Sequence, residues 1–196
     1  MYNKLNISEK HLLVLSLFTK GRYKEYYIRE AEKILKISLG TARRILNDLE
    51  KRGVLESKTR GRIKAYRIRA NETSRRYLTL TEQYKAIAFL QNRLIIKEII
   101  EKIMPHINGI GVIFGSYAKG DEKKDSDLDI FVAGECDRKE IKKVSETYGI
   151  EVSVKAYPSK TFENNLNKDI LLKEVSDNHI IFLNAEQFVK DVFEHG

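Results

Sequence analysis

Apolar residues recur along this chain at two different spacings, and the change of spacing marks where helices give way to strands. In the first half, helical spacing covers three segments: residues 8–18, 27–35 and 39–53. Ser8 stands where it can cap the first helix. After residue 53, apolar and polar residues alternate, which predicts strands over 54–58 and 63–69 around a turn at 59–61. The first half is therefore predicted to form three helices and a hairpin.

The second half alternates helical and strand patterns. Helical spacing predicts segments that either follow one another or join into one helix: 81–91 and 93–104. Short apolar strands are predicted over 110–114, 128–132 and 149–157, with a helix over 139–148. The tail, 178–193, is predicted as a strand followed by a closing helix that packs through Phe188, Val189 and Val192. Such alternation is typical of a sheet covered by helices.

The outward face of the third helix is basic. Arg43, Arg44 and Asn47 fall on the side opposite the apolar stripe, and such side chains suit a helix that lies in the major groove of DNA. More basic residues crowd the hairpin. The candidate DNA contacts are Thr41, Arg43, Arg44, Asn47, Lys58, Arg60 and Arg62. Residues 1–80 contain 20 Lys and Arg against 8 Asp and Glu, whereas the whole chain has a net charge of only +8. The charge pattern favours a phosphate-binding first half, although a chain with 33% charged residues is also well solvated.

The first half resembles the winged helix-turn-helix domain of DNA-binding regulators. The resemblance covers about residues 7–69, and the stretch from Ile45 to Leu55 is typical of a recognition helix and the wing strand after it. It implies double-stranded DNA as a partner. The same fold also serves in protein contacts, so that alternative stays open. Winged-helix regulators commonly form dimers, and segment 81–91, with Ala86, Ile87 and Phe89 expected on its surface, is a candidate homodimer contact.

Composition narrows the class of protein. Cys136 is the only cysteine, so an internal disulfide is excluded and a cytoplasmic location is expected. No apolar run is long enough to span a bilayer, and the N-terminus lacks the pattern of a secretory signal. No membrane association is predicted. The four histidines and Cys136 show no metal-ligand spacing, and His179 is expected to be structural.

The segment with most chemistry runs from residue 109 to residue 132. A short apolar strand leads into Gly115 and Ser116, where a glycine permits close approach of a ligand and a helix start favours phosphate. Asp127 and Asp129 head the next strand and point to one side of it, because strand residues two apart share a face. Two such carboxylates suit Mg²⁺ or Mn²⁺, although a pair of surface charges is the plainer alternative.

Gly115-Ser116, ten residues, then Asp127-x-Asp129 resembles the signature of the polymerase-beta-like nucleotidyltransferases, and specifically their minimal prokaryotic members. The resemblance covers about residues 92–193. It implies that Asp127 and Asp129 bind the metal, with Glu151 as the third carboxylate in both metal binding and catalysis; Glu135 and Asp137 are rivals. It also implies a nucleoside triphosphate substrate, with ATP expected, held by Gly115, Ser116, Lys119 and Ser126. Many relatives have Asp where Glu151 stands.

The predicted fold class is α+β, with a winged helix-turn-helix over 1–70, a helical connector over 71–91 and a nucleotidyltransferase core with a mixed sheet over 92–196. The predicted function is transfer of a nucleoside monophosphate to a hydroxyl on a partner macromolecule. Because no acceptor-binding domain is expected, that acceptor is predicted to be a protein, as in antitoxins that adenylylate a toxin. The alternative is a DNA-binding regulator whose second domain only senses nucleotide.

Overall fold

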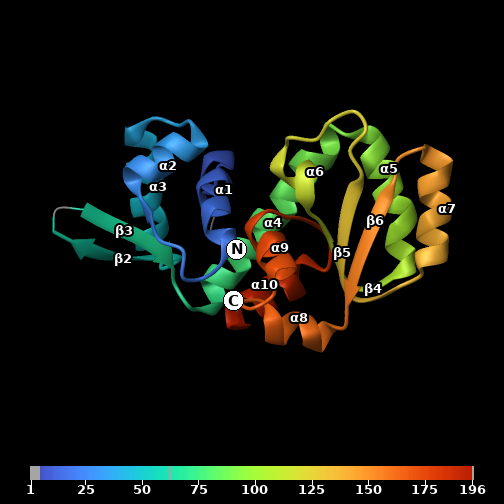
Figure 1. Cartoon of the computed structure of the whole chain (residues 1–196). Helices are drawn as coiled ribbons and strands as arrows, with labels where there is room; N and C mark the ends of the chain where they lie inside the picture. The colour runs from blue at the N-terminus through green and yellow to red at the C-terminus, as the bar shows by residue number, and fades with distance from the viewer. Residues whose placement is uncertain (1–4, 62, 196) are drawn as a thin grey trace. The chain divides into compact units, whose positions relative to one another are not determined.

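The computed structural model describes residues 5–61 and 63–195, and the chain divides into two compact units, Met1–Thr81 and Glu82–Gly196 (Figure 1). Helix α4 (Glu72–Gln91) contains the boundary between them. Each unit has its own sheet and its own buried apolar residues.

The first unit contains the helices and the hairpin that the sequence predicts. Its elements are α1 (Glu9–Leu15), η1 (Ser16–Lys20), β1 (Tyr26–Tyr27), α2 (Ile28–Leu35), α3 (Leu39–Lys51), β2 (Leu55–Arg60) and β3 (Ile63–Ile68). Ser8 is the N-cap residue of α1, as expected. The strands form an antiparallel sheet in the order β1-β3-β2. The two-residue strand β1 was not predicted, because so short an element leaves no alternation to detect.

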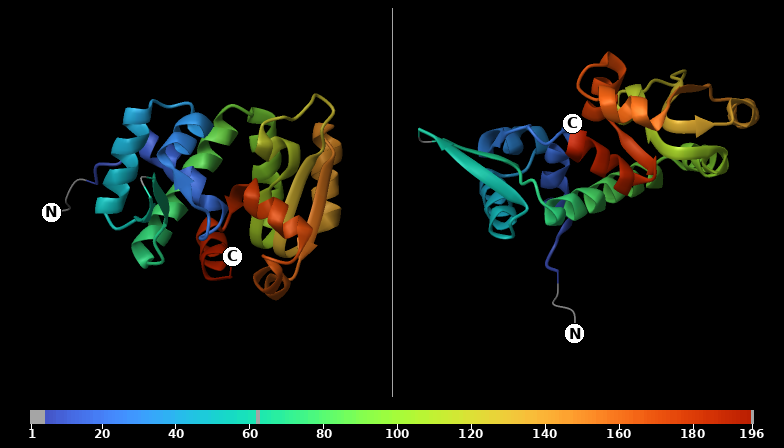
Figure 2. Two further views of the ribbon diagram at one scale, coloured as in Figure 1. Left: turned by 60° about the vertical axis from the view of Figure 1, so that its left-hand side comes forward. Right: turned by 90° about the horizontal axis from the view of Figure 1, so that it is seen from below.

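Helix α3 is defined by its cap and its apolar stripe. Ser38 Oγ accepts a hydrogen bond from the Thr41 amide at 3.2 Å, which satisfies one of the free amides at the helix start. One face of the helix is completely buried: Ala42, Ile45, Leu46 and Leu49. After α3 the hairpin begins, and β2 extends through Thr59 and Arg60, which the sequence placed in the turn. Figure 2 shows the hairpin extending away from the helices of its own unit.

Helix α4 begins nine residues earlier than the predicted start at residue 81. Asn71 Oδ1 accepts a hydrogen bond from the Ser74 amide at 2.8 Å, in the manner of a helix cap. Ser74 Oγ in turn donates to the Val54 carbonyl at 2.8 Å. Because these contacts are made by polar side chains, the spacing of apolar residues does not predict them. In the described part of the chain, neither α4 nor any other helix combines the length and the apolar character needed to cross a bilayer.

The predicted surface on segment 81–91 is partly wrong. Ala86 and Phe89 are 6% and 8% exposed and pack into the core of the second unit, whereas Ile87 is 56% exposed as expected. Their partners come from α5 (Leu94–Ile103), which includes Ile96, Ile99 and Ile100. The two helices are separate, with a break at residues 92–93.

The second unit is built on a mixed four-stranded sheet, which confirms the predicted α+β class. Its strands are β4 (Ile107–Ile113), β5 (Leu128–Cys136), β6 (Val152–Tyr157) and β7 (Ile180–Leu183). They lie in the order β6-β5-β4-β7, with β5 and β6 parallel and the other pairs antiparallel. The C-terminus of β4 and the N-terminus of β5 therefore lie next to each other at the same end of the sheet.

Helices cover both faces of this sheet (Figure 1). The remaining helices are η2 (Met104–His106), α6 (Gly115–Lys119), α7 (Arg138–Tyr148), α8 (Ser159–Asn165), α9 (Ile170–Asp177) and α10 (Ala185–His195). On one face α5 and α7 pack against Leu128 and Ile130. On the other, Phe131, Phe162 and Phe188 form a chain of aromatic contacts with α8 and α10. Helices α8 and α9 were not predicted.

Candidate active site

Gly115 brings the end of β4 against the start of β5. It follows Phe114, the N-cap residue of α6, and its φ of +68° lies in the left-handed region that favours glycine. A Cβ at this position would lie 2.3 Å from Asp129 Oδ2, so a larger residue would displace the carboxylate. Ser116 follows, half-buried, in the five-residue helix α6. The Gly-Ser pair and the aspartates thus share one site.

Asp127 and Asp129 lie on the same side of β5. Leu128 and Ile130, which alternate with them, are 0% exposed and face α5 and α7, so the two carboxylates leave on the opposite face. Asp127 is exposed and Asp129 is half-buried. Burial raises the pKa of Asp129, and the negative charges of Asp127 and Glu174 raise it further. Lys155 and Lys119 lower it in part.

The residues at this end of the sheet fit a divalent cation. Two carboxylates repel one another at this site and offer the hard oxygen ligands that Mg²⁺ and Mn²⁺ prefer. The space beside Asp129 Oδ2 that a Cβ would fill is kept free by Gly115. Among residues 5–61 and 63–195, no three His, Cys, Asp or Glu side chains are arranged to hold a metal. The protein therefore shows two predicted ligands together, and not a complete three-carboxylate group.

The predicted third carboxylate, Glu151, lies just before β6. In the parallel register Ser153, and not Glu151, stands beside Asp129. The Glu151 carbonyl accepts a hydrogen bond from the Leu128 amide at 2.8 Å, and the residue itself is exposed. Its role as a ligand stays a prediction. The rivals are less well placed, because Asp137 caps α7 at the other end of β5 and Glu135 lies near it.

Lys119 and Ser126 both have partners within the protein. Lys119 Nζ lies 2.7 Å from Glu174 Oε1 on α9, which raises the pKa of Lys119. Ser126 Oγ accepts a hydrogen bond from the Lys123 amide at 2.8 Å and so shapes the loop before Asp127. Neither contact tests the predicted binding of phosphate.

Residues 93–178 match the family model for a nucleotidyltransferase domain. Over these residues the second unit is similar to nucleotidyltransferase domains. The match includes Gly115, Ser116, Asp127 and Asp129, which the geometry brings together. It supports nucleotidyl transfer as the role of this unit.

Comparison with solved structures gives two distant likenesses, and no curated protein matches the chain. A possible transcriptional regulator from Methanosarcina mazei Go1 is 20% identical over 48% of this chain and 80% of its own, with a TM-score of 0.35. TrmBL2, described as an archaeal chromatin protein with a novel mode of DNA binding, is 11% identical over 88% and 71%, with a TM-score of 0.31. Both TM-scores are too low to bear on the fold or the function of this chain.

The loop between the two halves of the nucleotidyltransferase motif is tied to the helices behind it. Glu122 Oε1 accepts hydrogen bonds from Arg93 Nε at 2.9 Å and Nη2 at 2.7 Å. The same guanidinium lies 4.3 Å from the centroid of the Phe89 ring. Neither Arg93 nor Glu122 was predicted from the sequence to be a site residue, because Arg93 lies at the break between two helices and nothing in the sequence links it to Glu122. Their contact fixes the loop that leads to Asp127.

Lys155 and Glu174 are further residues of this site that the sequence analysis missed as candidates. Lys155 follows Ser153 on the same face of β6, and its charge acts on Asp129. Strand alternation alone was enough to place Lys155 there. Glu174 lies on α9, in a stretch where no element was predicted, so its approach to Asp129 had no signal in the sequence.

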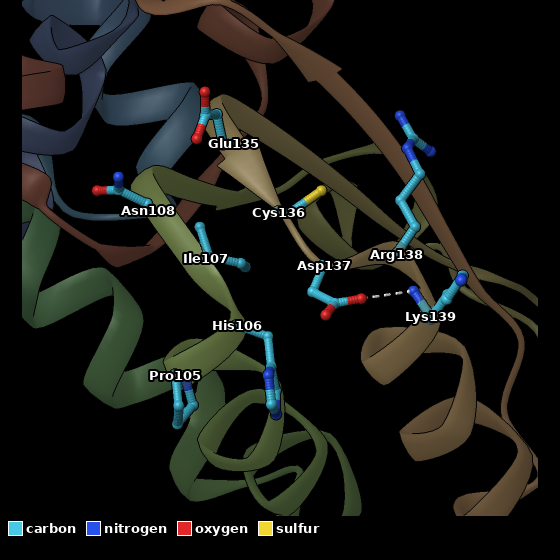
Figure 3. A pocket seen from close by; sticks show the side chains of 9 residues that line it. All are labelled: Pro105, His106, Ile107, Asn108, Glu135, Cys136, Asp137, Arg138 and Lys139. Atoms are coloured by element: carbon cyan, nitrogen blue, oxygen red, sulfur yellow. Dashed lines mark hydrogen bonds between the residues drawn. The ribbon is translucent and has the colours of Figure 1, made fainter.

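A cavity of about 790 Å³ lies at the opposite end of the sheet. It is lined by Pro105, His106, Ile107, Asn108, Glu135, Cys136, Asp137, Arg138 and Lys139. Figure 3 shows Glu135, His106 and Arg138 pointing in three different directions. Because these groups do not converge on one point, the cavity is a poor candidate for catalysis.

The predicted basic face of the first unit lies on α3 and the hairpin. Arg43 and Arg44 are exposed on α3, and Lys58 is exposed on β2. Arg60 is exposed as well, but it lies 3.2 Å from Glu25 in an ion pair. This surface offers cations to a phosphate backbone.

The other predicted DNA contacts are engaged locally or lie outside the described residues. Thr41 Oγ1 accepts a hydrogen bond from Ser38 Oγ at 2.9 Å, and Asn47 Oδ1 accepts one from the Tyr66 hydroxyl at 2.7 Å. Arg62 lies outside the described residues. A base contact by Asn47 would have to replace or share its bond to Tyr66.

Proposed function

We propose that the second unit transfers a nucleoside monophosphate from a nucleoside triphosphate, with ATP as the expected donor, to a hydroxyl group on a partner protein. The observation that supports this most is the contact between Gly115 and Asp129. A Cβ added to Gly115 would lie only 2.3 Å from Asp129 Oδ2, so only glycine leaves room for the Asp129 carboxylate here. The Gly-Ser turn therefore lies against Asp129, an arrangement that suits nucleotidyl transfer.

The positions of the residues support the roles that we propose for them. Asp127 and Asp129 would hold Mg²⁺ or Mn²⁺, and the backbone at Ser116 together with Lys119 would bind the triphosphate. When bound, the cation supplies charge neutralisation at the phosphates and lowers the pKa of the acceptor hydroxyl. The acceptor oxygen attacks the α-phosphorus, its proton passes to a base, and pyrophosphate leaves. Glu151 stays the proposed base, and Ser126 is proposed to shape the phosphate end of the site.

The choice of a protein acceptor rests on resemblance. Minimal nucleotidyltransferases include antitoxins that adenylylate a partner toxin, and we propose the same class of reaction here. The direct test is to incubate the protein with α-labelled ATP, Mg²⁺ and cell lysate. We expect one or more labelled protein bands that disappear with Asp127→Asn. Absence of label on any macromolecule would contradict the transfer, and so would label unaffected by that substitution.

For the first unit we propose a winged helix that binds double-stranded DNA through Arg43, Arg44 and Lys58. Their exposure on α3 and β2 supports this proposal. If the second unit only sensed nucleotide, the protein would be a DNA-binding regulator, and its DNA affinity would change with ATP while no pyrophosphate was released. Measuring pyrophosphate release and DNA affinity in the same preparation separates the two functions.

The DNA proposal has its own test. Binding of the full chain to DNA fragments should weaken steeply as salt rises, because each phosphate contact releases counterions. Arg43→Ala with Arg44→Ala should weaken binding about tenfold and reduce the salt slope by about two. Arg76→Ala on α4, where Arg76 pairs with Glu72, serves as the matched control. A first unit that binds no DNA at any salt concentration would favour a protein partner instead.

A further inference from the structure

An ion pair joins the helix after the Gly-Ser turn to α9. Lys119 is the last residue of α6, and its Nζ lies 2.7 Å from Glu174 Oε1. Both side chains are 40% exposed, so both are open to solvent and to a ligand. The contact joins segments 55 residues apart in the chain. It therefore depends on the tertiary fold and not on helical spacing.

Helix α9 holds Glu174 at this place. Asp169 caps the helix, accepting a hydrogen bond from the Leu172 amide at 3.1 Å. Leu172 and Val175 are 0% exposed and pack beneath the sheet with Phe131 and Phe162. A helix fixed by two buried residues leaves Glu174 on its rim, half-buried, beside the nucleotide site.

The pair lies close enough to Asp129 for both of its charges to act there. The negative charge of Glu174 raises the pKa of Asp129, after burial and Asp127, and the positive charges of Lys155 and Lys119 lower it. Three carboxylates, Asp127, Asp129 and Glu174, therefore act on one another together with two ammonium groups, Lys155 and Lys119. Of these two ammonium groups, Lys119 is already paired with Glu174. A nucleoside triphosphate without a cation adds several more negative charges and finds Lys119 engaged.

We propose that Glu174 is a positioning residue that withholds the Lys119 ammonium from a metal-free nucleotide and releases it to the triphosphate when a divalent cation is bound. The inference rests on the proposed nucleotidyl transfer and refines it. Without the cation, a Lys119 ammonium that leaves Glu174 for a phosphate oxygen leaves three carboxylates, Asp127, Asp129 and Glu174, repelling the triphosphate. With the cation, this repulsion is offset, and Lys119 can leave Glu174 for the phosphates at little cost. The pair therefore makes the site select the metal-bound form of the nucleotide.

The test measures ATP affinity of the full chain by calorimetry, once with Mg²⁺ and once with a chelator. Glu174→Gln should tighten metal-free binding about fivefold or more, because a repelling charge is lost and Lys119 is freed. Its effect with Mg²⁺ should be less than about twofold. In a Lys119→Met background the gain should largely vanish, because the two side chains act as one unit. Glu174→Ala provides a second reading if Glu174→Gln folds poorly.

Glu140→Gln is the matched control, because Glu140 pairs with Lys143 on α7, which follows the end of β5 opposite to Asp129. It should leave both affinities within about twofold. An equal gain in the Lys119→Met background, or weaker metal-free binding by Glu174→Gln, would overturn the inference while leaving the proposed function intact. If the unaltered protein binds no ATP under either condition, the proposed function fails and takes this inference with it.

Discussion

The two ends of β5 both carry polar side chains, but only one end gathers them. At the Leu128 end, Asp127 and Asp129 leave on one face and Gly115 lies against Asp129. At the Cys136 end there is a cavity of about 790 Å³, yet its polar side chains diverge (Figure 3). Asp137 there already accepts hydrogen bonds from the Lys139 and Glu140 amides, at 3.0 and 3.2 Å. The convergence of polar groups, and not the volume of a cavity, distinguishes a candidate active site from an ordinary surface cavity.

The largest expected effect separates the aspartates of the two ends. Asp129→Asn should lower nucleotidyl transfer by about 10³-fold, because a ligand of the cation and its charge are lost. Asp137→Asn should leave transfer within about twofold, since Asn caps helices nearly as well as Asp. The measurement is initial rate of pyrophosphate release at saturating ATP and Mg²⁺. Equal losses for the two variants would remove the distinction between the ends.

The second effect uses two glycines with nearly the same backbone. Gly115 and Gly149 have φ of +68° and +64°, but an added Cβ meets Asp129 Oδ2 at the first and nothing within 4 Å at the second. Both alanine variants should lose about 1 kcal/mol of stability from the left-handed conformation. Only Gly115→Ala should also lower transfer, by about 10²-fold, through displacement of the carboxylate. Thermal unfolding and transfer rates, measured together, separate the shared backbone cost from the specific loss.

The sequence predicted the strands that flank the candidate site better than it predicted the helices around them. Strand alternation predicts that Asp127 and Asp129 share a face, and the motif resemblance adds Gly115 and Ser116 to the same candidate site, because a strand and a short turn involve only a few neighbouring residues. The sequence also predicted the buried face of α10, since Phe188, Val189 and Val192 recur at helical spacing and are at most 6% exposed. Neighbouring residues carry such information wherever the fold is decided locally.

What the sequence left open depends on contacts between distant segments. The approach of Glu174 to Lys119 is set by the packing of α9, and nothing near residue 174 indicates it. The surface predicted for Ala86 and Phe89 was wrong for the same reason, because the partners that bury them lie on α5 and on the sheet. The early start of α4 depends on Asn71, which accepts a hydrogen bond from the Ser74 amide, and on the Ser74 hydroxyl, which donates to the Val54 carbonyl. Apolar spacing reports none of these.

The third effect compares the buried ion pair of His179 and Glu82 at the site end with His106 at the other end. His179 precedes β7 at the site end, and its Nε2 lies 2.9 Å from Glu82 Oε1, with both side chains 1% exposed. Burial alone would raise the pKa of Glu82, but the charges of His179 and Lys85 outweigh it and lower the pKa from 4.5 to about 2. Glu82→Gln should therefore cost about 3 kcal/mol in the free energy of unfolding at neutral pH. His106→Gln, at the other end, should stay within about 0.5 kcal/mol.

The pH dependence of that cost has a definite sign. A depressed carboxylate pKa adds stability above its ordinary value of 4.5, and this contribution is lost as pH falls toward about 2. The gap between the unaltered protein and Glu82→Gln should therefore narrow below pH 4.5. Urea unfolding near neutral pH and near pH 3 measures it. A gap that stays constant over this range would mean that the ion pair does not stabilise the fold.

The smallest effect concerns how each end is tied down. Arg93 holds the loop before Asp127 through Glu122, whereas Arg138, at the far end, donates to the Val154 carbonyl at 2.8 Å on the edge strand β6. Arg93→Gln should lower the rate of transfer about fivefold, because a loop without this contact holds Asp127 less firmly in place. The free energy of unfolding should change by less than about 1 kcal/mol. Arg138→Gln should leave transfer unchanged. Glu122→Gln should reproduce the Arg93 loss, and the double variant should add nothing further, since both changes break one contact. Additive losses would show that Arg93 acts elsewhere.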